Sequence, residues 1–436
     1  MSTHNSTSTP RHERGGASLG RRRLFKGAVA AGGLAAAGVG GLQIAQAAED
    51  DDTADATQSG HPGMLHTQDD FDRMAEQVTA GAEPWIQGWD KLVANGRSHS
   101  DWSPRPLATV IRGGDGQNYA QLFPDIAAAY QNALRWKVSG DTAHRDCAVN
   151  ILNAWSETLV EVTGNADRFL ASGIYGYQFS NAAEIVRDVE GFDLPRFQDM
   201  ITNIFVPMSE HFLTNHNDAC ITNYWANWDL CNMANILAAG ILCDDQVLFD
   251  RAVDYFWNGE GNGAIDNAIP FVYDGGLAQW QESGRDQGHS IMGIGLMSSI
   301  MEMAWNQGVD LYGANDNAFA KAAEYVARYN SGNDDLPFTT YSWGTGQNCD
   351  YREQTVMGEG GRGQARPVWE MVYGHYTQRQ GFAMPNVAAL AGANTPEGGG
   401  GDYGSNSGGY DTLGFGTLAH VRLHWEDIPD DLTPLG

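Results

Sequence analysis

The stretch IAAAYQNAL, residues 126–134, shows the pattern that decides the fold. Its apolar residues recur every three or four positions, which is the period of an α-helix with one face turned toward a core. The helix is expected to end at about Gly140, because glycine commonly terminates helices.

Similar periodic stretches continue along the chain, and most of them are bounded by Gly, Asp or Asn. Consecutive amphipathic helices joined by short loops form hairpins, which can stack into a solenoid or close into an α/α toroid. No repeat of fixed period favours the solenoid. The expected fold is therefore all-α, an (α/α) toroid, with helices at about 142–162, 167–189, 194–215, 222–243, 245–258, 286–307, 315–330 and 367–380, and two more before Gly96.

Two regions break the helical pattern, residues 331–366 and the glycine-rich residues 392–409. The glycines resemble a phosphate loop only superficially, because no Lys-Ser/Thr pair follows and no strand precedes them. Beyond them, residues 412–418 and 421–423 are predicted to be short strands near the C-terminus.

The N-terminal segment has the pattern of an export signal. Paired arginines in Arg21-Arg22-Arg23-Leu24-Phe25-Lys26 precede an apolar run that is too short and glycine-rich to span a membrane. We expect residues 1–47 to be a twin-arginine signal peptide, 48–63 a disordered acidic leader and 64–436 a single domain. The mature protein would then be extracellular, without stable membrane association.

The charge balance limits the possible partners. The net charge of −28 becomes −33 without residues 1–47, which carry six basic residues and one acidic residue. Nucleic acid is therefore not an expected partner. An acidic sugar would have to be met by a local cluster of Arg, His and amide groups. The oligomeric state is left open.

The five cysteines are an odd number without a C-x-x-C pair, so they indicate neither a zinc site nor a dense disulfide framework. Buried thiols are expected for Cys147, Cys231 and Cys243, which sit in apolar helical patterns. One disulfide formed after export stays possible.

The densest polar cluster, QWQESGRDQGH at residues 279–289, runs directly into an apolar helix. Asp286 is expected to cap that helix, with Arg285 at its mouth and His289 one turn in. The positive end of a helix suits a carboxylate. A purely structural interpretation is equally open, in which Arg285 pairs with Glu282 and His289 belongs to the inner face.

Three further motifs offer polar groups on helix faces. Residues 223–229, NYWANWD, place two asparagines four residues apart beside tryptophans that can stack on sugars or pack between helices. Residues 367–376, PVWEMVYGHY, offer tyrosines and a histidine for proton transfer or for packing. Between about 170 and 187, one helix face carries Tyr177, Asn181 and Glu184, which are either solvated or line a cleft.

Taken in order, these motifs resemble the alginate-lyase-like polysaccharide lyases, such as alginate and glucuronan lyases, over residues 105–420. The resemblance implies an (α/α) toroid, a uronic-acid glycan cleaved by β-elimination, and neither metal nor cofactor. It implies catalytic roles for His289, Arg285, Tyr177, Tyr373 and Asn227, and substrate binding by Asn181, Asn223, Trp228, Gln281, Glu282, His375 and Tyr376.

The chain departs from that family at two places. Well-understood members carry an Asn-His pair where this sequence has Ile221-Thr222, and a catalytic tyrosine where it has Ile291-Met292. His289 and a tyrosine from another helix, Tyr177, Tyr373 or Tyr376, would have to replace them.

Two other functions remain possible from the sequence. A toroidal glycoside hydrolase would need an acid and a base carboxylate across a cleft, and a glycan-binding protein would have no working base. Carboxylates available to a hydrolase are Asp274, Glu282, Asp286 and Glu370.

Overall fold

In the computed structural model, which describes residues 60–400, 403 and 410–436, the helix expected from residues 126–134 is α3 (Leu122–Ser139). It ends as predicted at Gly140, whose φ of 73° is a left-handed conformation that glycine adopts at little steric cost. Asp141 then starts α4 (Thr142–Thr158) by accepting a hydrogen bond from the Ala143 N–H. Gly140 and Asp141 thus end one helix and start the next.

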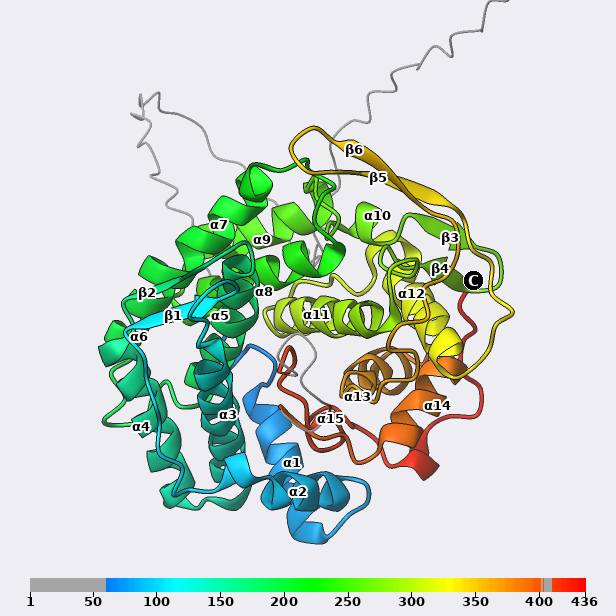
Figure 1. The fold of residues 1–436 in the computed structure, drawn as a ribbon. Coiled ribbons are helices and arrows are strands. Elements are labelled where there is room, and N and C mark those ends of the chain that lie inside the picture. Colours follow the sequence, from blue (N-terminus) through cyan, green and yellow to red (C-terminus); the bar gives the residue numbers. More distant parts are fainter. Residues whose placement is uncertain (1–59, 401–402, 404–409) are drawn as a thin grey trace, which may run out of the picture. The chain divides into compact units, whose positions relative to one another are not determined.

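The central helices follow one another as hairpins (Figure 1). Inner helices α3, α5, α8 and α11 pack successively against one another, and all but one residue of α5 and of α8 are buried. This is the helical toroid that the sequence predicted. The bounds are α5 (Arg168–Ile185), α6 (Leu194–Met200), η3 (Ile201–Phe205), α7 (Val206–Asn215), α8 (Ala226–Leu242), α9 (Gln246–Asn258), α10 (Ile265–Ala268), α11 (Gln287–Asn306) and α12 (Ala314–Asn330).

Segments from both ends of the described chain complete the core. Figure 1 shows α11 between α8 and α13, and α15 lies against α1, α2 and α13. Trp85 and Arg73 donate hydrogen bonds to the carbonyl of Val421, which ties the first helices to the last. These elements are α1 (Gln68–Ala80), α2 (Trp85–Ala94), α13 (Trp369–Tyr373), η5 (Gly374–Arg379), α14 (Pro385–Asn394) and α15 (Gly416–Ala419), with short turns η1 (Gly96–Ser98), η2 (Tyr119–Gln121), η4 (His216–Asp218) and η7 (Trp425–Asp427).

The prediction of strands at residues 412–418 and 421–423 is wrong. Gly414 and Phe415 both have positive φ, 74° and 59°, which breaks an extended chain, and α15 follows directly. The described strands lie elsewhere, in three two-stranded sheets: β1 (Thr109–Arg112) with β2 (Glu161–Gly164), β3 (Phe271–Tyr273) with β4 (Leu277–Gln279), and β5 (Tyr341–Thr345) with β6 (Asp350–Gln354). The first pair is parallel and the other two are antiparallel.

One disulfide, Cys220–Cys349, joins the segment before α8 to the β5–β6 hairpin. The hairpin lies within residues 331–366, the first of the two regions that break the helical pattern. Cys147 and Cys231 are buried free thiols and Cys243 is half-buried. Burial raises the pKa of Cys147 to about 11 and that of Cys243 to about 12, so these thiols stay protonated and unreactive at neutral pH.

The folded domain begins earlier than expected from the sequence. His61 contacts Glu184 at 2.6 Å and Asp244 at 2.9 Å, so residues 60–63 are packed rather than part of a disordered leader. The expected signal peptide and residues 48–59 lie outside the described residues. Within the described part, none of the helices combines the length and the apolar character that crossing a membrane requires.

Candidate active site

Asp286 caps α11, as the sequence predicted. Its Oδ1 accepts a hydrogen bond of 2.8 Å from the backbone N–H of His289. The two preceding N–H groups, of Gln287 and Gly288, both donate to the carbonyl of Gly360. The first turn of α11 is therefore already satisfied, and the expectation that this helix end could receive a carboxylate does not hold.

His289 is oriented by contacts to both of its ring nitrogens. Nδ1 lies 2.8 Å from one carboxylate oxygen of Asp286, and Nε2 lies 3.1 Å from Nη2 of Arg285. Because a guanidinium can only donate, Nε2 must accept and Nδ1 must carry the hydrogen. Burial tends to raise the pKa of Asp286, but the hydrogen bonds from His289 outweigh it and lower that pKa. His289 is thus held with the lone pair of Nε2 directed at the Arg285 guanidinium.

Arg285 is anchored on the buried carboxylate of Glu282, whose side chain is 0% exposed. Nη1 of Arg285 donates to Glu282 Oε2 over 2.9 Å, and the guanidinium lies 5.3 Å from the centre of the Trp225 ring. Asn227 donates to the same carboxylate through its backbone N–H, at 2.8 Å, and through its side chain. Arg285 keeps 25% of its side chain exposed, so this fixed cation faces solvent.

Tyr341, on strand β5, contacts the same motif. Its hydroxyl donates to the carbonyl of Gln281 over 2.5 Å and lies close to Gly284. Burial raises the pKa of Tyr341, so the phenol stays protonated at neutral pH. The side-chain oxygen of Gln281 accepts from the Ala226 N–H over 3.1 Å, which fixes the start of α8 against the motif.

Sequence reasoning missed Tyr341 because it lies in the region that breaks the helical pattern. The alternation Tyr341-x-Trp343 was the available signal, since residues two apart on a strand share one face. The motifs at 223–229 and 279–289 do come together, through Glu282, Asn227 and Gln281.

The predicted residues Tyr177 and Asn181 do not reach this cluster. Both lie on one face of α5 as expected, but they are buried, and Tyr177 donates to the carbonyl of Asp411 over 2.8 Å. Asn181 accepts from the Leu65 N–H over 3.0 Å. Asp411 itself forms a fully buried ion pair with Arg366. The hydroxyl of Tyr177 is thus already engaged in holding the C-terminal segment.

The predicted residues His375 and Tyr376 are also committed to the interior. The His375 ring stacks on Tyr312 with centroids 3.5 Å apart, and Arg379 donates to its Nδ1 over 2.7 Å. Burial, together with Arg379, lowers the pKa of His375 to about 3, so this ring stays neutral. Tyr376 donates to the carbonyl of Tyr312 over 2.8 Å. Both side chains therefore stabilise packing around η5.

Asn223 and Trp228 make structural contacts beside the site. Asn223 accepts from the Gly346 N–H over 2.7 Å, which holds the turn of the β5–β6 hairpin. Trp228 packs on Tyr224 and Phe212, with centroids 4.6 Å and 5.9 Å away. Of the two uses expected for Trp228, stacking on a sugar or packing between helices, the contacts show packing.

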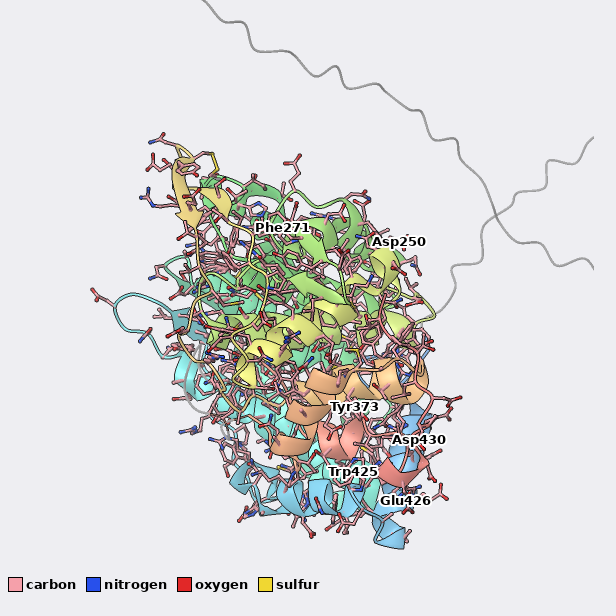
Figure 2. The ribbon with its side chains drawn as sticks, turned by 90° about the vertical axis from the view of Figure 1, so that its right-hand side faces the viewer. Asp250, Phe271, Tyr373, Trp425, Glu426 and Asp430 are labelled. Atoms are coloured by element: carbon pink, nitrogen blue, oxygen red, sulfur yellow. A yellow bond between two sulfur atoms is a disulfide. The ribbon has the colours of Figure 1, made fainter. Side chains whose placement is uncertain are left out.

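Tyr373 lies in a separate groove. The groove, of about 500 Å³, is lined by Tyr373, Glu370, Trp425 and Asp430. Figure 2 shows Tyr373, Trp425 and Asp430 together, at the end of the view away from the β5–β6 hairpin. None of the contacts described for Tyr373 joins it to Arg285 or His289, whereas Tyr341 contacts the segment from Gln281 to Gly284.

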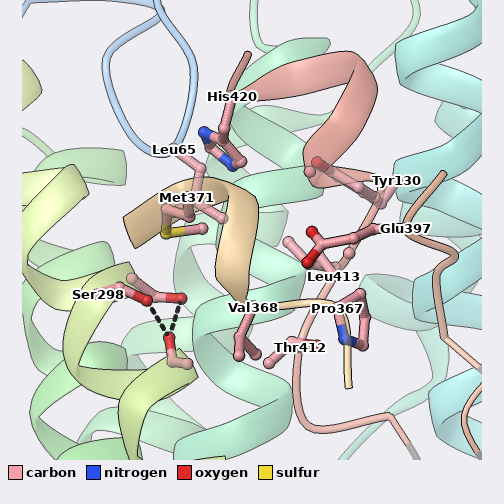
Figure 3. A pocket seen from close by; sticks show the side chains of 14 residues that line it. Leu65, Tyr130, Ser298, Pro367, Val368, Met371, Glu397, Thr412, Leu413 and His420 are labelled. Carbon is pink, nitrogen blue, oxygen red and sulfur yellow. Dashed lines mark hydrogen bonds between the residues drawn. The ribbon is translucent and has the colours of Figure 1, made fainter. Parts of the chain in front are cut away.

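Glu370 and Glu397 form a buried carboxyl pair beside that groove. Glu397 accepts from the Trp369 N–H over 2.9 Å, Glu370 accepts from the Thr395 hydroxyl over 3.0 Å, and each keeps one buried oxygen without a hydrogen bond. Figure 3 shows Glu397 directed into a small interior cavity near Tyr130. Burial raises the pKa of Glu370 to about 7, and burial and Glu370 raise that of Glu397 further.

Glu370→Gln is expected to reduce the loss of stability at alkaline pH. A raised pKa means that the stabilising proton is fully present below the usual 4.5 and is lost as pH rises through about 7. Between pH 5 and pH 8 the melting temperature of the variant should therefore fall by about 2–4 °C less than that of the parent. Thermal unfolding at both pH values measures this, with half-exposed Glu210→Gln as control. Equal pH dependence in parent and variant would refute the raised pKa of Glu370.

The described residues contain no group of three or more His, Cys, Asp or Glu side chains placed to hold a metal ion. Within the Arg285 cluster, the groups available are a fixed cation, an oriented imidazole and a protonated phenol. Such a set can bind a carboxylate, remove a proton next to it and protonate a leaving oxygen.

Comparisons with known proteins agree with this fold. Alginate lyase A1-III from Sphingomonas species A1 superposes with a TM-score of 0.56 at 13% identity, over 84% of this chain and 98% of that one. A variant of alginate lyase A1-III complexed with a tetrasaccharide superposes with a TM-score of 0.52 at 13% identity, over 74% and 91% of the two chains. None of the curated proteins matches this chain in sequence.

The family assignment rests on a match in sequence. The family described as alginate lyase matches residues 108–336, more than half of the chain. That range contains the motifs at 223–229 and 279–289, which the fold brings together around Glu282. The chain belongs to the alginate lyase family and is a polysaccharide lyase.

Proposed function

We propose that this protein is an exported lyase that cleaves a uronic-acid polysaccharide, such as alginate or glucuronan, by β-elimination without a metal. The observation that carries the proposal is the placement of His289 Nε2 beside Arg285, with Asp286 holding the other ring nitrogen. Export is supported by the paired arginines and the apolar run of residues 1–47. The tetrasaccharide bound by an alginate lyase of the same fold supports a glycan substrate.

Arg285 is the group that would receive the uronate carboxylate. Abstracting a proton from the carbon next to a carboxylate is unfavourable unless the negative charge that develops is offset. Arg285 is partly exposed, and its position is fixed by Glu282. A carboxylate that takes the N–H now given to His289 would also free the lone pair on Nε2.

His289 would then remove the proton from that carbon, with its imidazolium stabilised by Asp286. The electron pair of the broken C–H bond forms the new carbon–carbon double bond as the bond to the glycosidic oxygen breaks. The departing oxygen takes a proton from the Tyr341 hydroxyl, which is protonated at neutral pH. The products are an unsaturated uronate end and a new reducing end, and no water is consumed.

The hydrolase alternative is less well supported by the carboxylates. Hydrogen bonds from Asn227 and Arg285 occupy both oxygens of Glu282, which leaves it no free acid function. Asp286 is occupied by capping α11 and by His289. Asp274 is exposed beside β3 and Glu370 is buried beside Glu397. The hydrogen bonds that occupy Glu282 and Asp286 therefore favour elimination over hydrolysis.

The experiment is to incubate the mature protein with polyuronates in the presence of EDTA. Ultraviolet absorbance from an unsaturated product reports elimination, and a count of reducing ends reports cleavage by any route. Both signals should rise together. Complete loss of activity with EDTA, restored by one divalent ion, would refute the metal-free mechanism.

A further inference from the structure

The β5–β6 hairpin has two unlike faces. Its register pairs Tyr341 with Gln354 and Trp343 with Arg352, so these four side chains share one face, while Tyr351 belongs to the other. Tyr341 and Gln354 both approach Gly284, which identifies their face as the one turned toward the Arg285 cluster. We call this face, with Trp343 and Arg352, the inner face.

Several contacts fix the hairpin in place beside α8. The disulfide Cys220–Cys349 ties its turn to the preceding segment, and the Cys220 N–H donates to the Gly346 carbonyl over 2.7 Å. Thr222 both accepts from the Gly344 N–H and donates to the Gly344 carbonyl. A short, otherwise exposed hairpin is thereby held against the candidate active site.

The inner face continues the aromatic surface that starts at Arg285. The guanidinium of Arg285 lies 5.3 Å from the Trp225 ring, and the Trp225 and Trp343 ring centroids are 4.9 Å apart. Both tryptophans are half-buried. Arg285, Trp225 and Trp343 therefore form one continuous row, which passes from the segment before α11, by the start of α8, to β5.

Arg352 adds a cation to the end of that row. It is exposed, and its guanidinium donates to the carbonyl of Tyr351. In the part of the chain that the structure describes, Arg352 forms no salt bridge, as is also true of other arginines such as Arg105 and Arg328, so no carboxylate contact offsets its charge. Arg352 is distinguished by its position, because it is exposed and lies directly across the strand pair from Trp343.

We propose that Trp343 and Arg352 form a binding subsite for a second uronate ring of the polymer, next to the ring held at Arg285. This inference rests on the proposed function. The Trp343 ring would stack on the apolar face of the sugar, and Arg352 would meet its carboxylate. A neutral glycan would gain the stacking but not the charge contact, so the pair selects for acidic chains.

The kinetic test compares Trp343→Ala and Arg352→Ala with Tyr351→Ala, the control on the opposite face, whose side chain is 66% exposed. On the polyuronate that the parent cleaves, the first two changes should raise KM by about tenfold, with a smaller effect on kcat. The Arg352 effect should shrink at high salt. The subsite would be overturned if both variants had KM values within about twofold of the parent, or if Tyr351→Ala raised KM as much as they do.

A binding test separates this inference from the proposed reaction. Native electrophoresis of the full mature chain is run through gels containing alginate, glucuronan or a glycosaminoglycan. Retardation of the parent that is lost in Trp343→Ala and Arg352→Ala supports the subsite, even where no product forms and the lyase proposal fails. A parent that no gel retards, or variants retarded as strongly as the parent, would overturn it.

Discussion

His289→Ala is expected to lower kcat/KM on a cleaved polyuronate by about 10²–10⁴-fold, the usual loss when a general base is removed. Its Nε2 is the one oriented base beside Arg285, because Asp286 fixes the other ring nitrogen. The melting temperature should hardly change. The ring is partly exposed, and the cap of α11 uses the backbone N–H of residue 289, which alanine retains.

Elimination rate and melting temperature are therefore measured together for His289→Ala. The matched control is His211→Ala, an exposed histidine on α7, which should leave both values close to those of the parent. Arg285→Ala should also lower kcat/KM by about 10²-fold or more, through loss of the carboxylate partner. A His289→Ala protein that is less stable but fully active would remove this residue from the mechanism.

Glu282→Ala is expected to have the largest effect on folding, a loss of about 3–5 kcal/mol in the free energy of unfolding. This carboxylate is fully buried and receives hydrogen bonds from the backbone and side chain of Asn227 and from Arg285. Its removal would leave those donors without an acceptor and would release Arg285 from its place. Activity should fall as well, because the cation is no longer fixed.

Denaturant unfolding of Glu282→Ala, Glu282→Gln and Glu210→Ala measures the effect. Glutamine keeps one acceptor for Asn227, so its loss should be smaller, about 1–3 kcal/mol. Glu210 pairs with Arg251 near the surface, and its removal should cost less than about 1 kcal/mol. A Glu282→Ala protein of parental stability would contradict the anchoring role given to this carboxylate.

The helices and the motifs could be predicted from the sequence because their signals are local. Apolar periodicity located α3, glycine at 140 ended it, and Asp286 capped α11. The contact between the motifs at 223–229 and 279–289 was not predicted from the sequence. Its physical basis, the Asn227–Glu282–Arg285 network, joins residues 55 positions apart and needed the structure.

The tyrosine proposed as the proton donor could not be identified from the sequence, because the burial and the hydrogen-bond partners of each tyrosine depend on tertiary packing. Tyr177 and Tyr376 have the spacing of functional residues, yet both are fully buried, whereas Tyr341 is partly exposed. Tyr341 comes from a hairpin whose position is set by Cys349, 129 residues from its partner Cys220. The prediction of C-terminal strands was wrong for a local reason, because Phe415 has a positive φ, which is rare for a residue with a large side chain.

The most direct test of the central claim is ultraviolet absorbance recorded while the mature protein acts on alginate, glucuronan and a glycosaminoglycan in the presence of EDTA. Reducing ends are counted in the same samples. We expect absorbance and reducing ends to rise in proportion on at least one polyuronate, because each elimination creates one unsaturated uronate and one new end. Reducing ends without absorbance would mean that the protein is a hydrolase. Neither signal on any of these chains would favour a protein that binds glycans without cleaving them. Either result would contradict the assignment of Arg285 and His289 to β-elimination.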